Sequence, residues 1–173
     1  IDFATQQIGV SDHLYGWSKL TAERMLWEIS QHRNVGITVL RPFSGYGPAQ
    51  STDYPMADLL QRIQRSPDHV EVWGTGYQTR DFVHVDDIIR TLAWAVTSDH
   101  TYFTLNVGTG IATSFLELVD ILHQAVHGRS CQSIEPQPNR PQGVQHRVAD
   151  IQQLTALGLE PAISLIQGVK TLL

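Results

Sequence analysis

Cysteine is almost absent from this sequence of 173 residues, because Cys131 is the single one. One thiol excludes an internal disulfide and a zinc site built from cysteines. Chains with so little cysteine are typical of reducing compartments, so we expect a cytoplasmic protein. No histidine or lysine stands next to Cys131 to activate it, and we interpret it as a free thiol.

Lysine and long apolar runs are also scarce. The chain has 12 basic and 17 acidic residues, a formal net charge of -5, and only Lys19 and Lys170 as lysines. No basic stripe is available to neutralise a phosphate backbone, which disfavours nucleic acid as a partner. No apolar run approaches the roughly 20 residues that span a bilayer, so we expect no membrane partner. The 8 histidines show no ligand spacing with carboxylates on one helix face, so we expect no metal site.

Helical and extended patterns alternate along the chain, which predicts an α/β fold. Short apolar or β-branched runs bounded by glycine, proline or polar residues predict extended segments at 36–40, 70–73, 81–85 and 103–107. Apolar residues at helical spacing predict helices bearing the following inward faces: Met56, Leu59, Leu60 and Ile63; and Phe115, Leu118, Val119 and Leu122. Ser114 and Glu117 have the spacing of a capping box.

Two further segments complete the expected architecture. Residues 129–147 are polar and rich in proline, so we expect a long ordered loop there. Two short helices, at about 151–157 and 163–172, are expected to follow it.

The first expected helix is capped by Ser11 or Asp12 and ends near Gln31. Its inward face is expected to hold Ala22, Met25, Leu26 and Ile29, which keep the spacing of one helix side. Leu20 and Trp27 lie on another side of the same helix. A second apolar stripe predicts a second packing partner, and we favour a homodimer through this helix.

Tyr15 and Lys19 are four residues apart, so on a helix they lie about one turn apart on one face. A tyrosine hydroxyl is a poor base at neutral pH because its ordinary pKa is near 10, and a neighbouring ammonium group stabilises the phenolate. Such a pair can move a proton while a hydride moves to or from a nicotinamide. The simpler alternative is a surface tyrosine beside a surface lysine, and the spacing alone does not separate the two.

Longer motifs follow this pair in a fixed order. They are YGWSKLTAERM at 15–25, LRPFSGYGP at 40–48, WGTGYQTRDFVHVDDI at 73–88 and NVGTG at 106–110, and then RP at 140 and ADI at 149. In this order they resemble the nucleotide-sugar epimerases and dehydratases of the extended short-chain dehydrogenase/reductase family, the UDP-glucose 4-epimerase-like group. The resemblance covers nearly the whole chain.

The resemblance implies the C-terminal part of a Rossmann-type doubly wound parallel sheet together with a smaller α/β substrate-binding domain. Residues 1–48 and 83–112 would form the rear half of the NAD-binding domain. Residues 49–82 and 113–173 would form the nucleotide-sugar-binding domain. NAD is the implied cofactor, and a nucleoside-diphosphate sugar is the implied substrate.

The resemblance also implies a role for individual residues near the cofactor. Tyr15 would be the catalytic acid/base, and Lys19 would stabilise its phenolate and hydrogen-bond the nicotinamide ribose. Both residues would thereby also contact the cofactor. Pro42 and Phe43 would line the nicotinamide pocket.

A second set of residues would bind the substrate. Arg80 and Arg140 match the arginines that clamp the diphosphate, a task that suits the guanidinium fork. An ion pair of Arg80 with Asp81 or another neighbour is the alternative. Tyr77 would approach the base or the ribose. Ser44 stands where relatives commonly have an asparagine that contacts the sugar nucleotide, and its hydroxyl is shorter and offers one donor instead of two.

Several other polar residues are interpreted as structural. His84 is expected to be a packed, hydrogen-bonded histidine, and Asp86 or Asp87 is expected to cap the helix that follows. The segment Gly108-Thr109-Gly110 imitates a dinucleotide-binding fingerprint, except that Thr113 stands in place of the third glycine. We therefore interpret its glycines as turn residues.

Complete relatives begin with the βαβ unit that holds the NAD pyrophosphate, and they carry a catalytic serine or threonine ahead of the tyrosine. Only 14 residues precede Tyr15, the first residue is Ile1, and no methionine stands before Met25. We therefore expect the C-terminal portion of an enzyme, inactive by itself. Its uncovered sheet is expected to be disordered near the N-terminus or to leave an apolar face for another chain.

Four functions stay open at this point. The preferred one is an NAD-dependent nucleotide-sugar epimerase that acts through a keto intermediate. A nucleotide-sugar 4,6-dehydratase is the second, and a non-catalytic fragment that binds a nucleotide sugar or a partner is the third. A reductase of small carbonyl compounds is disfavoured, because residues 73–88 resemble the nucleotide-sugar enzymes.

Overall fold

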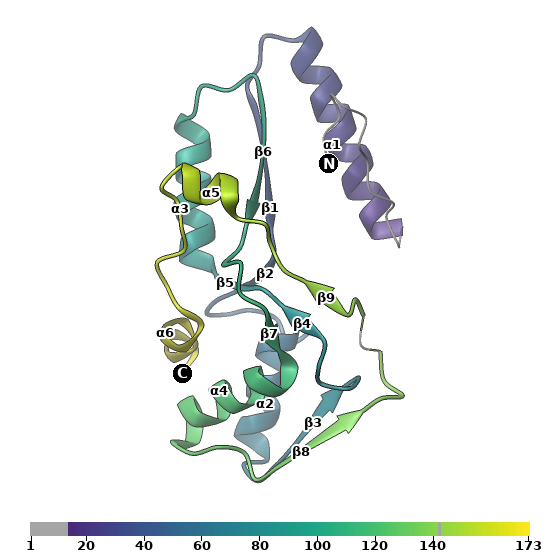
Figure 1. The fold of residues 1–173 in the computed structure, drawn as a ribbon, viewed down its shortest axis with the longest axis vertical. Coiled ribbons are helices and arrows are strands. Elements are labelled where there is room, and N and C mark those ends of the chain that lie inside the picture. The colour runs from purple at the N-terminus through teal and green to yellow at the C-terminus, as the bar shows by residue number, and fades with distance from the viewer. Residues whose placement is uncertain (1–13, 142) are drawn as a thin grey trace. The chain divides into compact units, whose positions relative to one another are not determined.

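The computed structural model describes residues 14–141 and 143–173, and its helices and strands alternate along the chain as expected (Figure 1). Ser11 and Asp12, the expected caps of the first helix, lie outside the described residues. The chain divides into two compact units, which are described separately. Unit 1 consists of Ile1–Arg41 and Ala93–Leu105, and unit 2 consists of Pro42–Leu92 and Asn106–Leu173. No helix in the described part of the chain is long and apolar enough to cross a membrane.

Two strands, β1 (Ile37–Pro42) and β6 (Tyr102–Val107), pair with each other, and the division between the units falls within both. The N–H of Ile37 donates to the carbonyl of Thr101 (3.1 Å), and that of Phe43 donates to the carbonyl of Val107 (2.9 Å). In both bonds the acceptor residue follows the donor residue by the same number of positions. The two strands therefore advance in the same direction and are parallel. The extended segments expected at 36–40 and 103–107 are thereby confirmed.

Helix α1 (Leu14–His32) belongs to unit 1, and the expectation for its inward face is wrong. Its buried residues are Leu20, Glu23 and Ser30. The expected face is exposed instead: Met25 by 61% and Ile29 by 42%. Hydrophobic spacing failed here because the buried side of the helix contains a charged residue.

Glu23 is buried because Arg41 of β1 pairs with both of its carboxylate oxygens. The guanidinium donates through Nε to Oε1 (2.8 Å) and through Nη2 to Oε2 (2.5 Å). The hydrogen bond to Glu23 raises the pKa of Arg41, while burial opposes it. The Tyr102 hydroxyl adds a hydrogen bond to the Glu23 carbonyl (3.4 Å). A bidentate pair of this kind fixes the helix to the strand pair of its own unit.

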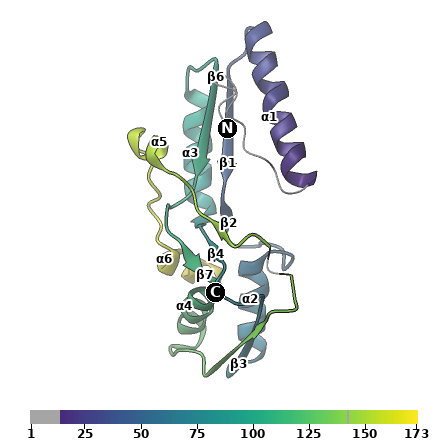
Figure 2. The ribbon, with the colours of Figure 1, turned by 45° about the vertical axis from the view of Figure 1, so that its right-hand side comes forward.

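Unit 2 has its core between helices α2 (Pro55–Arg65) and α4 (Phe115–His127), which lie side by side in both views (Figures 1 and 2). The apolar faces expected for these helices are confirmed, since all eight residues belong to the buried core. The capping box of Ser114 and Glu117 is also confirmed, and its hydrogen bonds lower the pKa of Glu117.

Short strands surround this core. Strand β2 (Ser44–Tyr46) pairs in parallel with β5 (Phe82–His84). Strand β3 (His69–Trp73) pairs in parallel with β8 (Ser133–Gln137). A further sheet has the order β7-β4-β9, made of Thr113–Ser114, Thr79–Arg80 and His146–Arg147.

The expectation that 129–147 is a loop is therefore wrong, because it contains β8 and β9. These two strands form because neighbouring strands supply backbone hydrogen bonds, and the polar sequence pattern does not predict such pairing. Pro136 is compatible with β8 because this strand pairs with β3 alone in its sheet.

Asp86 or Asp87 is expected to cap α3 (Val85–Thr97), and Asp87 does not do so. Its buried carboxylate accepts hydrogen bonds from the N–H groups of Ala162 (3.0 Å) and Ile163 (3.1 Å). Arg90 lies 2.9 Å from the same carboxylate. Asp87 thus ties the start of α3 to the segment just before α6 (Leu165–Val169). Helix α6, the preceding helix α5 (Gln152–Ala156) and the 3₁₀ turn Lys170–Leu172 lie close to where short helices are expected.

His84 is a packed, hydrogen-bonded histidine, as expected. It is 2% exposed, and its ring lies edge-on to that of Tyr46. The Asp86 N–H donates to Nδ1 (3.2 Å), so Nε2 carries the hydrogen that faces the Thr171 hydroxyl (3.1 Å). Burial raises the pKa of Tyr46 to about 12, so its hydroxyl stays neutral at physiological pH.

His123 of α4 joins the segments that lead into β3 and β8. It is fully buried, and its ring nitrogens lie 2.5 Å from the carbonyl of Pro67 and 2.6 Å from that of Arg129. Replacing it with phenylalanine keeps a ring but leaves both carbonyls without this partner. We expect His123→Phe to lower the free energy of unfolding by about 2 kcal/mol, measured by urea denaturation. His32→Phe, at an exposed position, is the control and should change it by less than about 0.5 kcal/mol. Equal effects of the two variants would contradict this assignment.

Candidate functional site

Tyr15 and Lys19 lie one turn apart at the start of α1, in unit 1. The Lys19 ammonium nitrogen is 5.1 Å from the centroid of the Tyr15 ring. Both side chains are exposed, Tyr15 by 73%, so a ligand can reach them. Glu23 stands one turn further along the helix and is held by Arg41. The pair therefore sits on an anchored helix with its polar groups accessible.

The TRDF and NVGTG motifs meet in unit 2 through the Asp81 side chain, which is fully buried. Thr109 donates to Oδ1 through its N–H (2.8 Å) and its hydroxyl (2.6 Å). The N–H groups of Gly110 (2.9 Å) and Ala149 (3.1 Å) donate to Oδ2. A Cβ on Gly108 would approach Oδ2 to 2.5 Å, so glycine is required there. The turn at 108–110 therefore binds a carboxylate of its own chain, in agreement with a structural interpretation of its glycines.

Arg80 immediately precedes Asp81 and is half-buried. Its Nη1 donates to the carbonyls of Thr79 (2.7 Å) and Val144 (2.6 Å), and its guanidinium carbon lies 5.7 Å from the Phe115 ring centroid. Burial, followed by the charge of Arg147, lowers the pKa of Arg80 from its usual value. These contacts fix the guanidinium in place before any ligand arrives.

Arg80 lines a cavity of about 490 Å³ that lies wholly within unit 2. Other lining residues are Asp58, Leu59, Arg62, Trp73, Gln78 and Phe115. The Arg140 guanidinium lies 5.6 Å from the Trp73 ring centroid, beside the cavity residue Pro141. The structure thus brings both predicted arginines to the surroundings of one cavity.

Trp73, at the end of β3, is an aromatic residue of the cavity lining. It is 43% exposed, because strand alternation turns it away from the core. The Arg62 guanidinium lies 5.2 Å from its ring centroid. Arg62 is held in turn by Asp58 (2.6 Å) and by the carbonyl of Glu71 (3.1 Å). A ring bordered by cations suits a ligand that combines an aromatic group with negative charge.

The remaining predicted residues of unit 2 lie outside the cavity lining. Pro42 ends β1, and Phe43 connects it to β2. Ser44 is held through its backbone, because its N–H donates to the Asp81 carbonyl (2.9 Å). Tyr77 is 70% exposed and is not among the residues that line the cavity.

Sequence reasoning did not single out Trp73, Arg62 or Asp58 as site residues. The alternation from His69 to Trp73, with Val70 and Val72 in the core, could have placed Trp73 on the outer side of its strand. For Arg62 and Asp58, the four-residue spacing predicts a helix-surface pair but not its contact with Trp73.

The parallel strand pairs, with helices between them along the chain, define an α/β protein. The sequence profile of the NAD dependent epimerase/dehydratase family matches residues 4–108, more than half of the chain. The chain therefore belongs to the NAD-dependent epimerase/dehydratase family. Members of this family act on nucleotide sugars as epimerases, dehydratases and decarboxylases.

Two curated relatives illustrate this range of reactions. The dTDP-L-rhamnose 4-epimerase of Burkholderia thailandensis is 31% identical over 164 residues, which are 90% of this chain and 44% of that protein. UDP-glucuronic acid decarboxylase 2 of Arabidopsis thaliana is 29% identical over 159 residues, which are 90% of this chain and 35% of that protein. The chain thus spans less than half the length of both relatives.

A solved structure supports the same fold. MoeE5, determined in complex with UDP-glucuronic acid and NAD, is 31% identical to this chain and superposes with a TM-score of 0.82. The match covers 96% of this chain and 56% of MoeE5. The expected α/β fold class and the family resemblance are thereby confirmed.

Proposed function

We propose that the protein carrying this chain is an NAD-dependent nucleotide-sugar epimerase. The observation that carries the proposal is the placement of Arg80 and Arg140 around the cavity that contains Trp73. A nucleoside diphosphate offers a flat base and two adjacent negative charges, which match an aromatic ring flanked by guanidinium groups. Unit 2 supplies both of these chemistries.

Arg80 and Arg140 bind the diphosphate in this proposal. Arg80 is held by the carbonyls of Thr79 and Val144, so its guanidinium is oriented at little further entropic cost. Arg140 follows β8 and is exposed, so it closes on the ligand from the side of Trp73. Ser44 and Tyr77 are proposed as further contacts to the nucleotide sugar.

Tyr15 holds and moves the proton of the reacting sugar hydroxyl. Lys19, one helical turn away, stabilises the phenolate form and donates hydrogen bonds to the nicotinamide ribose. Two exposed donors on an anchored helix fit the nicotinamide side of NAD, and Pro42 and Phe43 are proposed to line that pocket. NAD, when bound, supplies a hydride acceptor for the sugar carbon and afterwards a hydride donor.

An epimerase is preferred because the dTDP-L-rhamnose 4-epimerase, 31% identical over 164 residues, is more similar to the chain than the decarboxylase, which is 29% identical over 159 residues. In an epimerase, hydride leaves one face of the sugar carbon while Tyr15 takes the hydroxyl proton. Hydride then returns to the opposite face of the keto carbon, and Tyr15 gives the proton back. Each bond broken in the first half is thus re-formed in the second.

Domain roles, assembly and location belong to the same proposal. Residues 1–48 and 83–112 serve NAD binding, and residues 49–82 and 113–173 serve nucleotide-sugar binding. Leu20, one of the two residues on which the dimer prediction rests, is buried within unit 1, and the exposed apolar side chains of Met25, Leu26 and Ile29 support a homodimer through α1 instead. The single cysteine supports a cytoplasmic location.

Calorimetric titration of the chain with UDP-glucose and UDP-glucuronic acid tests the substrate class. Arg80→Ala should weaken binding about 10-fold to 100-fold, because it removes charge-assisted hydrogen bonds to the diphosphate. Arg65→Ala, at an exposed position at the end of α2, is the matched control and should bind like the unmodified chain. Equal affinity of the two variants would reject the diphosphate site. Binding without any hydride exchange in the protein carrying this chain would favour a non-catalytic nucleotide-sugar-binding function instead.

A further inference from the structure

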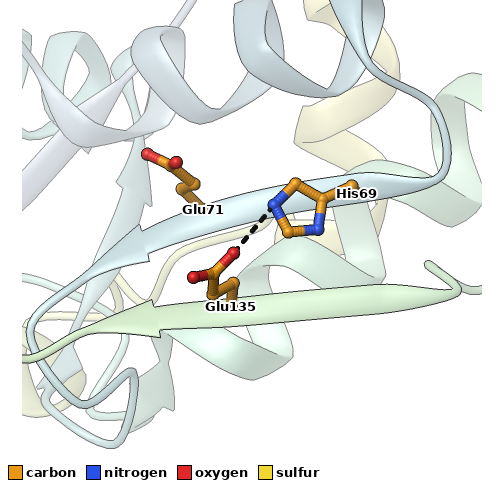
Figure 3. A group of neighbouring side chains, drawn as sticks. All are labelled: His69, Glu71 and Glu135. Atoms are coloured by element: carbon orange, nitrogen blue, oxygen red, sulfur yellow. Dashed lines mark ion pairs between the residues drawn. The ribbon is translucent and has the colours of Figure 1, made fainter.

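The paired strands β3 and β8 carry an ordered group of polar side chains on their outer face. Val70 and Val72 of β3 are buried in the core, so the alternation of the strand turns His69 and Glu71 outward. The register pairs His69 with Ser133 and Glu71 with Glu135. His69, Glu71 and Glu135 are thereby gathered on one exposed surface (Figure 3).

This group is compact. The Nε2 atom of His69 lies 3.1 Å from a carboxylate oxygen of Glu135. One ligand atom from each of the three residues lies within 4.8 Å of the other two. Among the residues that the structure describes, this is the one set of three histidine, cysteine or acidic side chains that meets this spacing. The Ser133 hydroxyl faces the other ring nitrogen of His69 at 3.4 Å, which favours Nε2 as the nitrogen available to a ligand.

Two features of this group suit a cation. The register places Glu71 and Glu135 opposite each other, and a bound cation would relieve the repulsion between their like charges. Separately, His69 adds a nitrogen donor to the two carboxylates, which favours zinc over the oxygen-seeking magnesium and calcium ions.

The spacing of these atoms also suits zinc. Tetrahedral ligands at about 2.0–2.1 Å from one zinc ion lie about 3.3 Å from each other. The 3.1 Å separation of His69 Nε2 and the Glu135 oxygen is close to this value. Glu71 is exposed, so its side chain has room to rotate toward the other two ligands.

We propose that His69, Glu71 and Glu135 form a zinc-binding site that joins β3 to β8. The site supplies three protein ligands, and water completes the coordination. It lies at the start of β3, whereas Trp73 and the cavity lie at its end. Zinc binding therefore requires neither the nucleotide sugar nor the proposed enzymatic reaction.

Calorimetric titration of the metal-free chain with ZnCl₂ tests this proposal. We expect one equivalent to bind at this site, and His69→Ala and Glu135→Gln each to weaken its affinity at least about 10-fold, the lower end of the effect of losing even an outer-shell partner. Glu71→Gln should weaken it as well. Saturating zinc should raise the melting temperature of the unmodified chain by about 5 °C and should not raise that of His69→Ala.

His146→Ala and Glu160→Gln, both at exposed positions outside the group, are the matched controls and should bind zinc like the unmodified chain. Cobalt substitution adds a spectroscopic test, because a tetrahedral site gives intense visible absorption that Glu135→Gln should remove. Circular dichroism of each variant establishes that it is folded. Equal zinc affinity of the unmodified chain and His69→Ala, or tighter binding of magnesium or calcium than of zinc, would overturn the proposal.

Discussion

Asp81→Asn is expected to lower the free energy of unfolding by about 4 kcal/mol, since removing one acceptor from a buried, charged hydrogen-bond network leaves several donors unsatisfied. The carboxylate accepts four hydrogen bonds, two on each oxygen, from Thr109, Gly110 and Ala149. An asparagine amide has one oxygen, and its NH₂ group would face two of these donors. Asparagine has nearly the same size, so the loss reports the hydrogen bonds and the charge of the carboxylate rather than a change in packing.

Thermal unfolding of the chain measures this effect. For a chain of this size, a loss of about 4 kcal/mol corresponds to a fall of about 10 °C in the melting temperature. Asp120→Asn makes the same chemical change at an exposed position of α4 and should leave the melting temperature within about 1–2 °C. A melting temperature for Asp81→Asn equal to that of the control would show that the buried network is not required.

Asp81→Asn should also weaken nucleotide-sugar binding below its melting temperature. Asp81 follows Arg80 directly. The backbone of Asp81 joins β2 and β9, because the Ser44 N–H donates to the Asp81 carbonyl and the Asp81 N–H donates to the Arg147 carbonyl. A loosened carboxylate therefore disturbs the backbone that positions the Arg80 guanidinium. Asp81 acts here as a positioning residue. Restored affinity at low temperature, where the variant is fully folded, would show that Asp81 contributes to stability alone.

Tyr15→Phe has the largest expected effect on activity. In the protein carrying this chain, we expect turnover of a nucleotide sugar to fall about 100-fold to 10,000-fold, the usual contribution of a positioned general acid/base. Phenylalanine keeps the ring that Lys19 contacts, and it removes only the hydroxyl that holds the proton. The affinity for UDP-sugars should change less than twofold, because the proposed diphosphate site lies on Arg80 and Arg140.

Single-turnover reduction of bound NAD separates chemistry from binding in this variant. Thr21→Ala, an exposed position on the same helix, is the control and should retain full turnover. Full activity of Tyr15→Phe would reject Tyr15 as the acid/base. Loss of activity together with loss of UDP-sugar affinity would assign it a binding function instead.

Local sequence patterns predicted the elements of the fold well where the buried side chains are apolar. The faces of α2 and α4 and the Ser114–Glu117 capping box follow from helical spacing, and the structure confirms them. The prediction of buried positions and helix caps failed where a charged side chain is buried through ion pairs or hydrogen bonds. Glu23 is buried by Arg41, and Asp87 binds the backbone of residues 162 and 163, so neither behaves as its local sequence indicates.

The candidate site was predictable in part. Arg80 and Arg140 could be singled out because ordered motifs surround them, and the same holds for Tyr15 and Lys19. Trp73 and Arg62 could not, since their contact joins an outward strand position to a helix surface. Such a contact depends on how the two elements pack, which hydrophobic periodicity does not specify.

The sequence by itself determined the alternation of helices and strands, the two helix faces of the main core and the family, because these depend on local spacing and on motifs in fixed order. Only the tertiary structure decided which distant side chains meet. Parallel pairing of β3 with β8 set Glu135 opposite Glu71 and beside His69, where the sequence had indicated no metal site. Strand register produces that cluster, and a register between distant segments is settled by packing of the whole core.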